Sequence, residues 1–178
     1  MSPAALIEGL SKAPGRAEIV GGEIVMMSPT GDMPSSASGA IYASLREYSG
    51  DQDGRAYVDN VAYLVELPHR KSFSPDASYY TGERSGMKFL PQAPDFAVEV
   101  RSENDYGPAA EEAIAAKRSD YFAAGTKVVW DVDLLGEDTV RVYRADKPQQ
   151  AEVYRKGDTA EAKPAVPGWR FLVEELFE

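Results

Sequence analysis

Residues 93–125 read APDFAVEVRSENDYGPAAEEAIAAKRSDYFAAG, and the rest of the fold is organised around this stretch. Its first part, 96–100, is typical of a buried strand interrupted by one carboxylate. Side chains alternate between the two faces of a strand. The predicted faces are Phe96, Val98 and Val100 on one side, and Ala97, Glu99 and Arg101 on the other. The pattern therefore places an acid, Glu99, inside the predicted sheet.

The second part of the stretch predicts a helix that begins near Pro108 and ends before Gly125. Proline fits the first turn of a helix, and glycine fits the left-handed position that terminates one. Three- and four-residue steps put one set of side chains on a single inward stripe. That stripe contains Ala110, Ala113, Ile114, Lys117, Tyr121 and Ala124. Lys117 therefore lies among apolar and aromatic neighbours.

Upstream, Asp76 stands at the start of another predicted strand, 75–80. Buried lysine and glutamate side chains are rarely left unpaired. Asp76, Glu99 and Lys117 on adjacent elements are a simple set for holding a divalent cation beside a basic group. The alternative is a structural ion pair between Glu99 and Lys117, with Asp76 an ordinary turn residue. Spacing alone does not separate these readings, because structural ion pairs use the same residue types.

The composition limits the chemistry that the chain can perform. Its length of 178 residues suits one domain, 1–178, with a hydrophobic core of its own. The chain has no cysteine, which excludes disulfides and thiolate metal sites. Its single histidine, His69, excludes a zinc site built from several histidines.

The formal net charge of -10 argues against broad, non-specific affinity for nucleic acid, which draws on many lysine and arginine contacts to phosphates. It leaves room for a locally basic groove or an acidic cluster neutralised by metal. The N-terminal residues lack the basic start and long apolar run of a secretory signal. No stretch approaches the roughly 20 apolar residues that span a bilayer. A cytoplasmic protein with no membrane segment is expected.

The remaining pattern predicts an N-terminal β-hairpin around Gly21-Gly22, followed by a helix and a series of strands. The predicted elements are the hairpin 17–20 and 23–27, a helix 34–48, a long strand 55–67 with a bulge or break at Asp59-Asn60, strands 75–80, 95–101, 126–132, 139–143 and 151–154, a loop 164–168, and a final strand and short helix 169–177. The strand, helix, strand crossover over 95–133 implies a parallel pair. The fold class is therefore α/β or α+β, with a mixed β-sheet flanked by helices.

This ordered set of features resembles the Uma-type restriction endonuclease family of the PD-(D/E)xK nuclease superfamily. The resemblance covers nearly the whole chain and rests on Glu18-Ile19-Val20, Gly22 to Val25, Met27-Ser28-Pro29, Pro75-Asp76, Phe96 to Ser102, Lys117, Tyr121, Ala124-Gly125, Trp130, Asp133, Pro167-Gly168-Trp169 and Glu175-Leu176-Phe177. It implies a restriction-endonuclease-like fold and metal-dependent cleavage of DNA.

By position, the resemblance implies that Asp76 and Glu99 are the two acids of the family. The superfamily lysine would stand two residues after the second acid, where this chain has Arg101. In this family the lysine has moved to the following helix, where Lys117 matches. Arginine stays protonated, so Arg101 is expected to contact phosphate or to pair with Glu99.

The implied mechanism uses Mg²⁺ or Mn²⁺ bound by Asp76, Glu99 and the Val100 carbonyl, with waters completing the shell. Lys117 would orient or deprotonate the attacking water, or balance charge on the phosphorus. Three further side chains are expected around these ligands: Glu18, Arg101 and Ser102.

The chain departs from the family near the start of its first long helix. Many members carry a histidine there, whereas residues 33–38 read MPSSAS. A nuclease-fold binding module without catalytic activity is therefore the alternative reading, and a metal-dependent hydrolase of small phosphorylated substrates is a third. A homodimer is expected, because cutting both strands of a duplex usually takes two sites.

Overall fold

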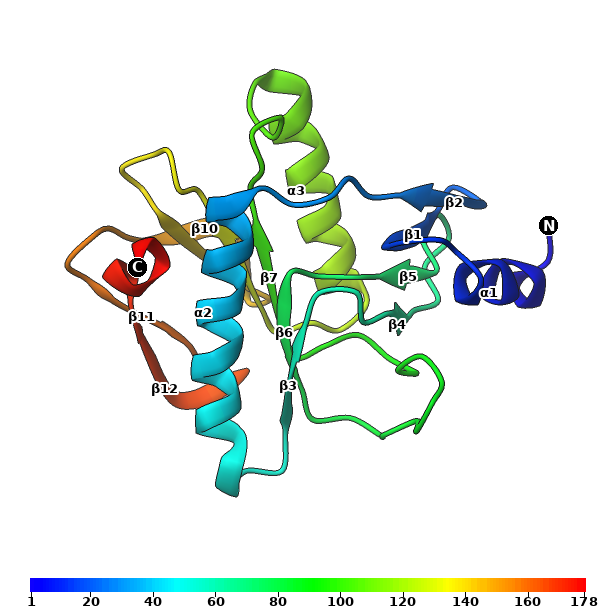
Figure 1. The fold of residues 1–178 in the computed structure, drawn as a ribbon, viewed down its shortest axis with the longest axis horizontal. Helices are drawn as coiled ribbons and strands as arrows, with labels where there is room; N and C mark the ends of the chain where they lie inside the picture. The colour runs from blue at the N-terminus through cyan, green and yellow to red at the C-terminus, as the bar shows by residue number, and fades with distance from the viewer.

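The computed structural model describes all residues, 1–178, and places a six-stranded sheet at the centre of the protein (Figure 1). Its strand order is β10-β9-β8-β7-β6-β3. The strands are β3 Arg55–Val58, β6 Ala77–Tyr80, β7 Phe96–Val100, β8 Val128–Val132, β9 Val140–Arg144 and β10 Lys147–Tyr154. Strands β7 and β8 are parallel and the other neighbours are antiparallel. The predicted mixed sheet is therefore confirmed.

The two long helices, α2 (Asp32–Tyr48) and α3 (Pro108–Ala123), cover opposite faces of this sheet. The side chains of β7 alternate between the two faces, and each face packs against a different helix. Phe96, Val98 and Val100 belong to the larger core with α2, whereas Ala97 belongs to a smaller core with Tyr121 of α3. The side-chain alternation predicted for 96–100 is thus confirmed.

The N-terminal part forms a separate layer at one end of the sheet, at the right of Figure 1. It contains α1 (Pro3–Ser11) and the hairpin of β1 (Ala17–Val20) and β2 (Glu23–Met26). Gly21 and Gly22 adopt positive φ angles of 60° and 78°, as a tight hairpin turn of this kind requires. The backbone N–H of Lys71 donates to Ile19 O at 2.9 Å. This bond ties the hairpin to the segment before β5.

The C-terminal part closes the α2 side of the molecule. It consists of the hairpin β11 (Thr159–Ala162) and β12 (Val166–Leu172), followed by the short 3₁₀ helix η2 (Val173–Phe177). Trp169 of β12 stacks near Trp130 of β8, with ring centroids 5.1 Å apart. Both tryptophans are buried in the α2 core.

Several predicted boundaries are wrong: among them, β10 begins at Lys147 rather than at residue 151, and β11 (Thr159–Ala162) was not predicted. The break predicted at Asp59-Asn60 is confirmed, because β3 ends at Val58 and Asn60 takes a left-handed φ of 71°, but the stretch 55–67 is two elements rather than one strand. After this turn β4 (Tyr63–Leu64) pairs with β5 (Ser72–Phe73), a strand that the pattern did not reveal. The loop predicted at 164–168 is largely part of β12, and the helix predicted from residue 34 begins at Asp32. A 3₁₀ turn, η1 (Ser49–Asp51), follows α2.

None of the helices combines the length and the apolar character that a membrane crossing requires.

Candidate active site

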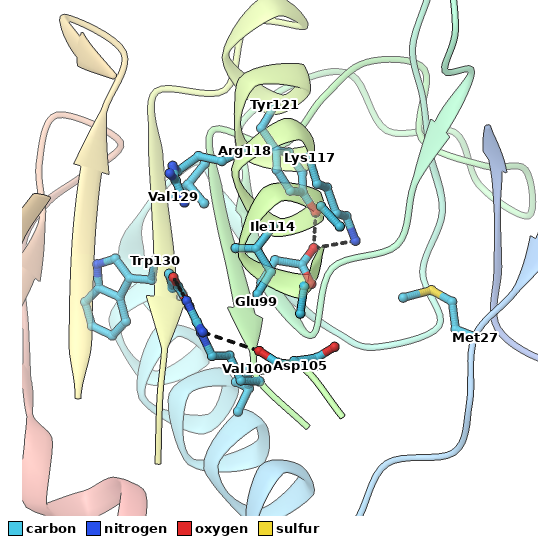
Figure 2. Close-up of a pocket in the computed structure, with 14 residues that line it drawn as sticks. Met27, Glu99, Val100, Asp105, Ile114, Lys117, Arg118, Tyr121, Val129 and Trp130 are labelled. Atoms are coloured by element: carbon cyan, nitrogen blue, oxygen red, sulfur yellow. Dashed lines mark hydrogen bonds and ion pairs between the residues drawn. The ribbon is translucent and has the colours of Figure 1, made fainter. Parts of the chain in front are cut away.

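Glu99 and Lys117 meet on the α3 face of the sheet. The Lys117 Nζ lies 2.8 Å from Glu99 Oε1 and 2.8 Å from Glu18 Oε1. The Tyr121 hydroxyl, one helical turn after Lys117, donates to Glu99 Oε1 at 2.6 Å. Figure 2 shows the side chains of Glu99, Lys117 and Tyr121 pointing toward one another. The lysine predicted on the inward stripe therefore reaches the acid predicted inside the strand.

Asp76 lies beside Glu99 because its segment continues the pairing of β6 with β7. Its backbone N–H donates to Val98 O at 3.0 Å, and its Oδ2 accepts from the Val100 N–H at 2.7 Å. Its Oδ1 accepts from Arg16 Nη1 at 2.8 Å. The Asp76 side chain is therefore held by one backbone donor and one guanidinium.

Glu18 reaches the same site from the hairpin strand β1. Its Oε1 accepts from the Ser74 N–H at 2.8 Å as well as pairing with Lys117, and its Oε2 accepts from Arg70 Nη1 at 2.8 Å. Arg70 Nε in turn donates to Asp120 Oδ2 at 2.9 Å. Glu18 thus links the outer hairpin to Lys117.

Burial and neighbouring charges raise the pKa of Glu99 and of Lys117 and lower the pKa of Glu18. Burial raises the pKa of Glu99, and the nearby carboxylates of Asp76 and Glu18 raise it further against the pull of Lys117. Burial also opposes ionisation of Glu18, but the attraction to Lys117 and Arg70 outweighs it and lowers that pKa. For Lys117, burial opposes the charged form, yet the attraction to Glu18 and Glu99 raises its pKa. Lys117 is therefore an ammonium group at neutral pH.

Arg101 does not lie against Glu99, contrary to one of its predicted roles. Its Nε and Nη2 donate to the two carboxylate oxygens of Asp131 at 2.9 and 2.8 Å. It also pairs with both oxygens of Glu111, on the first turn of α3. Asp131 stands opposite Glu99 in the parallel register of β7 and β8, and the planar guanidinium fits its carboxylate in a bidentate fashion. Arg101 therefore joins the sheet to the start of α3.

Ser102 takes part in the turn that follows β7. Its backbone N–H donates to Asp105 Oδ2 at 2.7 Å. That contact belongs to the loop before α3, and no contact of Ser102 with Asp76 or Glu99 is present.

The Arg101 contact gives Glu111 a measurable role in stability. Hydrogen bonding to Arg101 lowers the pKa of Glu111 below its ordinary 4.5. A lowered folded pKa stabilises the protein above the unfolded value, and this stabilisation is lost as the pH falls through the folded value. The side chain is 55% exposed, so we expect Glu111→Gln to cost under about 1 kcal/mol at neutral pH.

Urea unfolding of the wild type and of Glu111→Gln across acidic pH tests this expectation. The difference in free energy of unfolding should shrink as the pH falls below 4.5. A difference that is constant with pH would contradict the assigned ion pair.

A pocket of about 250 Å³ lies next to Glu99 and Lys117, beneath α3. Its apolar lining includes Ala110, Ala113, Ile114, Val129, Trp130 and Met27. The predicted inward stripe of α3 is only partly correct, since Ala113 is exposed and Ile114 is half-buried. Only the second half of the helix packs closely, where Asp120 and Tyr121 are buried. The helical periodicity predicted which face of α3 is turned toward the sheet, but it does not predict how closely that face packs against the sheet.

Several residues of the site were missed by reasoning from the sequence. Arg16 and Arg70 lie outside the predicted strands and helices, where local pattern carries no signal for a distant carboxylate. Asp120 lies in the predicted helix and Asp131 in the predicted strand 126–132, and no pattern distinguished either residue. A single sequence offers no signal that pairs these charges, because each contact joins segments far apart in the chain.

The donor set fits a divalent metal only in part. No three histidine, cysteine or carboxylate side chains stand close enough together to hold an ion by themselves. Asp76 nevertheless lies close enough to Glu99 for its negative charge to raise the pKa of Glu99. Two carboxylates, supplemented by backbone oxygen and water, are the kind of oxygen set that Mg²⁺ takes.

Comparisons with known proteins point to one family. The family model described as "Putative restriction endonuclease", Uma2, matches residues 5–174. A crystal structure from Anabaena variabilis, titled as a putative nuclease belonging to DUF820, is similar with a TM-score of 0.74. The two chains share 18% sequence identity, and the match covers 97% of each. At this identity the likeness shows the fold. No curated protein matches the chain.

Proposed function

Because the chain belongs to the Uma2 restriction endonuclease family, we propose that it is a metal-dependent endonuclease that hydrolyses phosphodiester bonds of DNA. The observation that carries this proposal is the meeting of Asp76, Glu99 and Lys117, which come from three separate segments. Two acids and an ammonium group on one sheet face can serve charge-stabilised phosphoryl transfer.

In the proposed site Asp76 and Glu99 would hold Mg²⁺ or Mn²⁺, with the Val100 carbonyl and water as further ligands. When bound, such an ion lowers the pKa of a coordinated water and polarises a phosphate oxygen. Tyr121 and Val100 keep the two carboxylates in place through their hydrogen bonds. These contacts orient the acids before any ion arrives.

Lys117 acts as a positive charge rather than as a base. Its raised pKa keeps it protonated, so it stabilises negative charge on the phosphoryl oxygens. Glu18 supports this role by holding the ammonium at 2.8 Å. Of the roles foreseen for Lys117, charge balance is the one that its surroundings favour.

The test is cleavage of plasmid, single-stranded DNA and nucleotide substrates with Mg²⁺, with Mn²⁺ and with a chelator. Asp76→Asn and Glu99→Gln are each expected to reduce metal-dependent cleavage by a factor on the order of 10² or more. Glu66→Gln, which removes an exposed acid paired with Lys71, serves as the matched control. Cleavage that survives both site variants would contradict the proposal, and turnover of nucleotides alone would identify a small-molecule hydrolase.

A nuclease-fold binding module without catalytic activity is the second candidate. The net charge of -10 and the internal pairing of Asp76 with Arg16 and of Glu99 with Lys117 favour it. DNA binding without cleavage under every metal condition would support this candidate. The nuclease proposal includes a homodimer. Sedimentation of the protein with duplex DNA would measure how many protein chains the complex contains.

A further inference from the structure

The proposed active site holds as many internal cations as acids. Its acids are Glu18, Asp76 and Glu99, and its cations are Arg16, Arg70 and Lys117. Every one of these charges lies within 2.8 Å of an opposite charge. Asp120, itself buried, shares Arg70 with Glu18 and also contacts the half-exposed His69. Each acid of the inner cluster is therefore already paired with a cation before a metal enters.

Arg16 forms its one ion pair with Asp76. Its Nη1 lies 2.8 Å from Asp76 Oδ1, and no other cation contacts this carboxylate. Its Nε donates to Ser74 O at 3.1 Å and to Ser74 Oγ at 3.3 Å, and its Nη2 also contacts Ser74 O. The side chain is only 12% exposed. Arg16 is thus fixed in the site although it comes from the connector between α1 and β1.

This pairing opposes a metal ion that arrives alone. A divalent ion beside Asp76 and Glu99 would add two positive charges next to the guanidinium of Arg16 and the ammonium of Lys117. Repulsion between like charges at such short range is strong in a poorly solvated site. A phosphodiester brings one negative charge, and a guanidinium binds phosphate oxygens in a bidentate manner. Metal and phosphodiester together therefore add only one positive charge, half of what the metal alone would add.

We propose that Arg16 couples metal binding to substrate binding: it suppresses binding of the metal while it neutralises Asp76, and it contacts the phosphodiester once both are present. This inference rests on the proposed nuclease function. It adds that the wild-type protein binds metal weakly without DNA and that a single connector residue sets this dependence. The coupling is reciprocal, so the metal also strengthens DNA binding by the same factor.

Titration with Mn²⁺, read from the signal of the free ion by electron paramagnetic resonance, tests the coupling. Each protein is titrated alone and with a duplex carrying cleavage-resistant phosphorothioate linkages. The Mn²⁺ bound by the duplex alone is measured separately and subtracted. For the wild type, the duplex should raise Mn²⁺ affinity by about tenfold or more. For Arg16→Met, Mn²⁺ should bind about tenfold tighter without DNA, and the duplex should change this affinity little.

Three variants control the experiment. Arg16→Lys retains the charge and should bind Mn²⁺ as weakly as the wild type without DNA. Arg16→Gln removes the charge while keeping a side-chain donor for Ser74, and it replaces Arg16→Met if that variant unfolds. Arg46→Met removes a positive charge from the exposed end of α2, away from the site, and should leave the Mn²⁺ affinity unchanged.

The outcomes separate this inference from the function on which it rests. Equal Mn²⁺ affinity of wild type and Arg16→Met, with and without the duplex, would overturn the coupling and leave the metal site standing. Absence of Mn²⁺ binding in every protein, with and without the duplex, would overturn both. Weaker DNA-free binding in Arg16→Met would show that Arg16 supports the metal site rather than competing for it.

Discussion

Lys117→Met is expected to reduce DNA cleavage by a factor on the order of 10² to 10³, the usual cost of removing one group that stabilises transition-state charge. The substitution removes the ammonium that lies 2.8 Å from both Glu18 and Glu99. Glu18 keeps Arg70 as a partner, and Glu99 keeps the Tyr121 hydroxyl. The fold should therefore survive, and single-turnover cleavage at saturating metal measures the effect.

Lys127→Met is the matched control for this prediction. Lys127 follows α3 closely in the chain, its side chain is 53% exposed, and it pairs loosely with Asp95 at 3.4 Å. Its loss should leave cleavage within about twofold of the wild type, because exposed ion pairs contribute little. A Lys117→Met protein that is folded and cleaves at the wild-type rate would contradict the role assigned to this lysine.

Arg101→Met is expected to destabilise the protein by about 3–5 kcal/mol, as removal of one partner from a buried ion pair does. Arg101 and Asp131 have side chains that are 4% and 5% exposed. Without the guanidinium, Asp131 keeps only Arg141, whose Nη1 lies 3.9 Å away. The buried carboxylate would be left without a close partner, and urea unfolding measures the resulting loss of free energy.

Arg141→Met is the appropriate comparison, because its side chain is 27% exposed and its contacts to Asp131 and Asp133 are 3.9 and 4.0 Å long. We expect it to cost under about 1 kcal/mol. If Arg101→Met instead abolished DNA binding with no loss of stability, Arg101 would be a phosphate contact, as the sequence suggested, and the structural role assigned to it would be wrong.

The sequence predicted the inner part of the candidate site because local patterns specify it. Alternation along 96–100 fixed which face carries Glu99, and the helical steps from Pro108 pointed Lys117 toward that face. Both follow from the geometry of a single strand and a single helix. The strand, helix, strand crossover then places the helix over that face of the sheet and so brings the two side chains together.

The parts that the sequence did not predict depend on contacts between distant segments. The partner of Arg101 depends on the parallel register that sets Asp131 opposite Glu99, and no local pattern encodes that register. Arg16 reaches Asp76 across 60 positions of sequence. The left-handed Asn60, which ends β3, was visible only as a break within a longer β-prone run.

The central claim, that Asp76 and Glu99 hold a catalytic metal beside Lys117, is tested most directly by diffraction. Crystals grown with Mn²⁺ and a cleavage-resistant duplex should show one strong anomalous peak between the carboxylates of Asp76 and Glu99. The same peak should be absent from Asp76→Asn crystals grown in the same way. Bound duplex with no manganese between these two acids, or with manganese only elsewhere, would contradict the account.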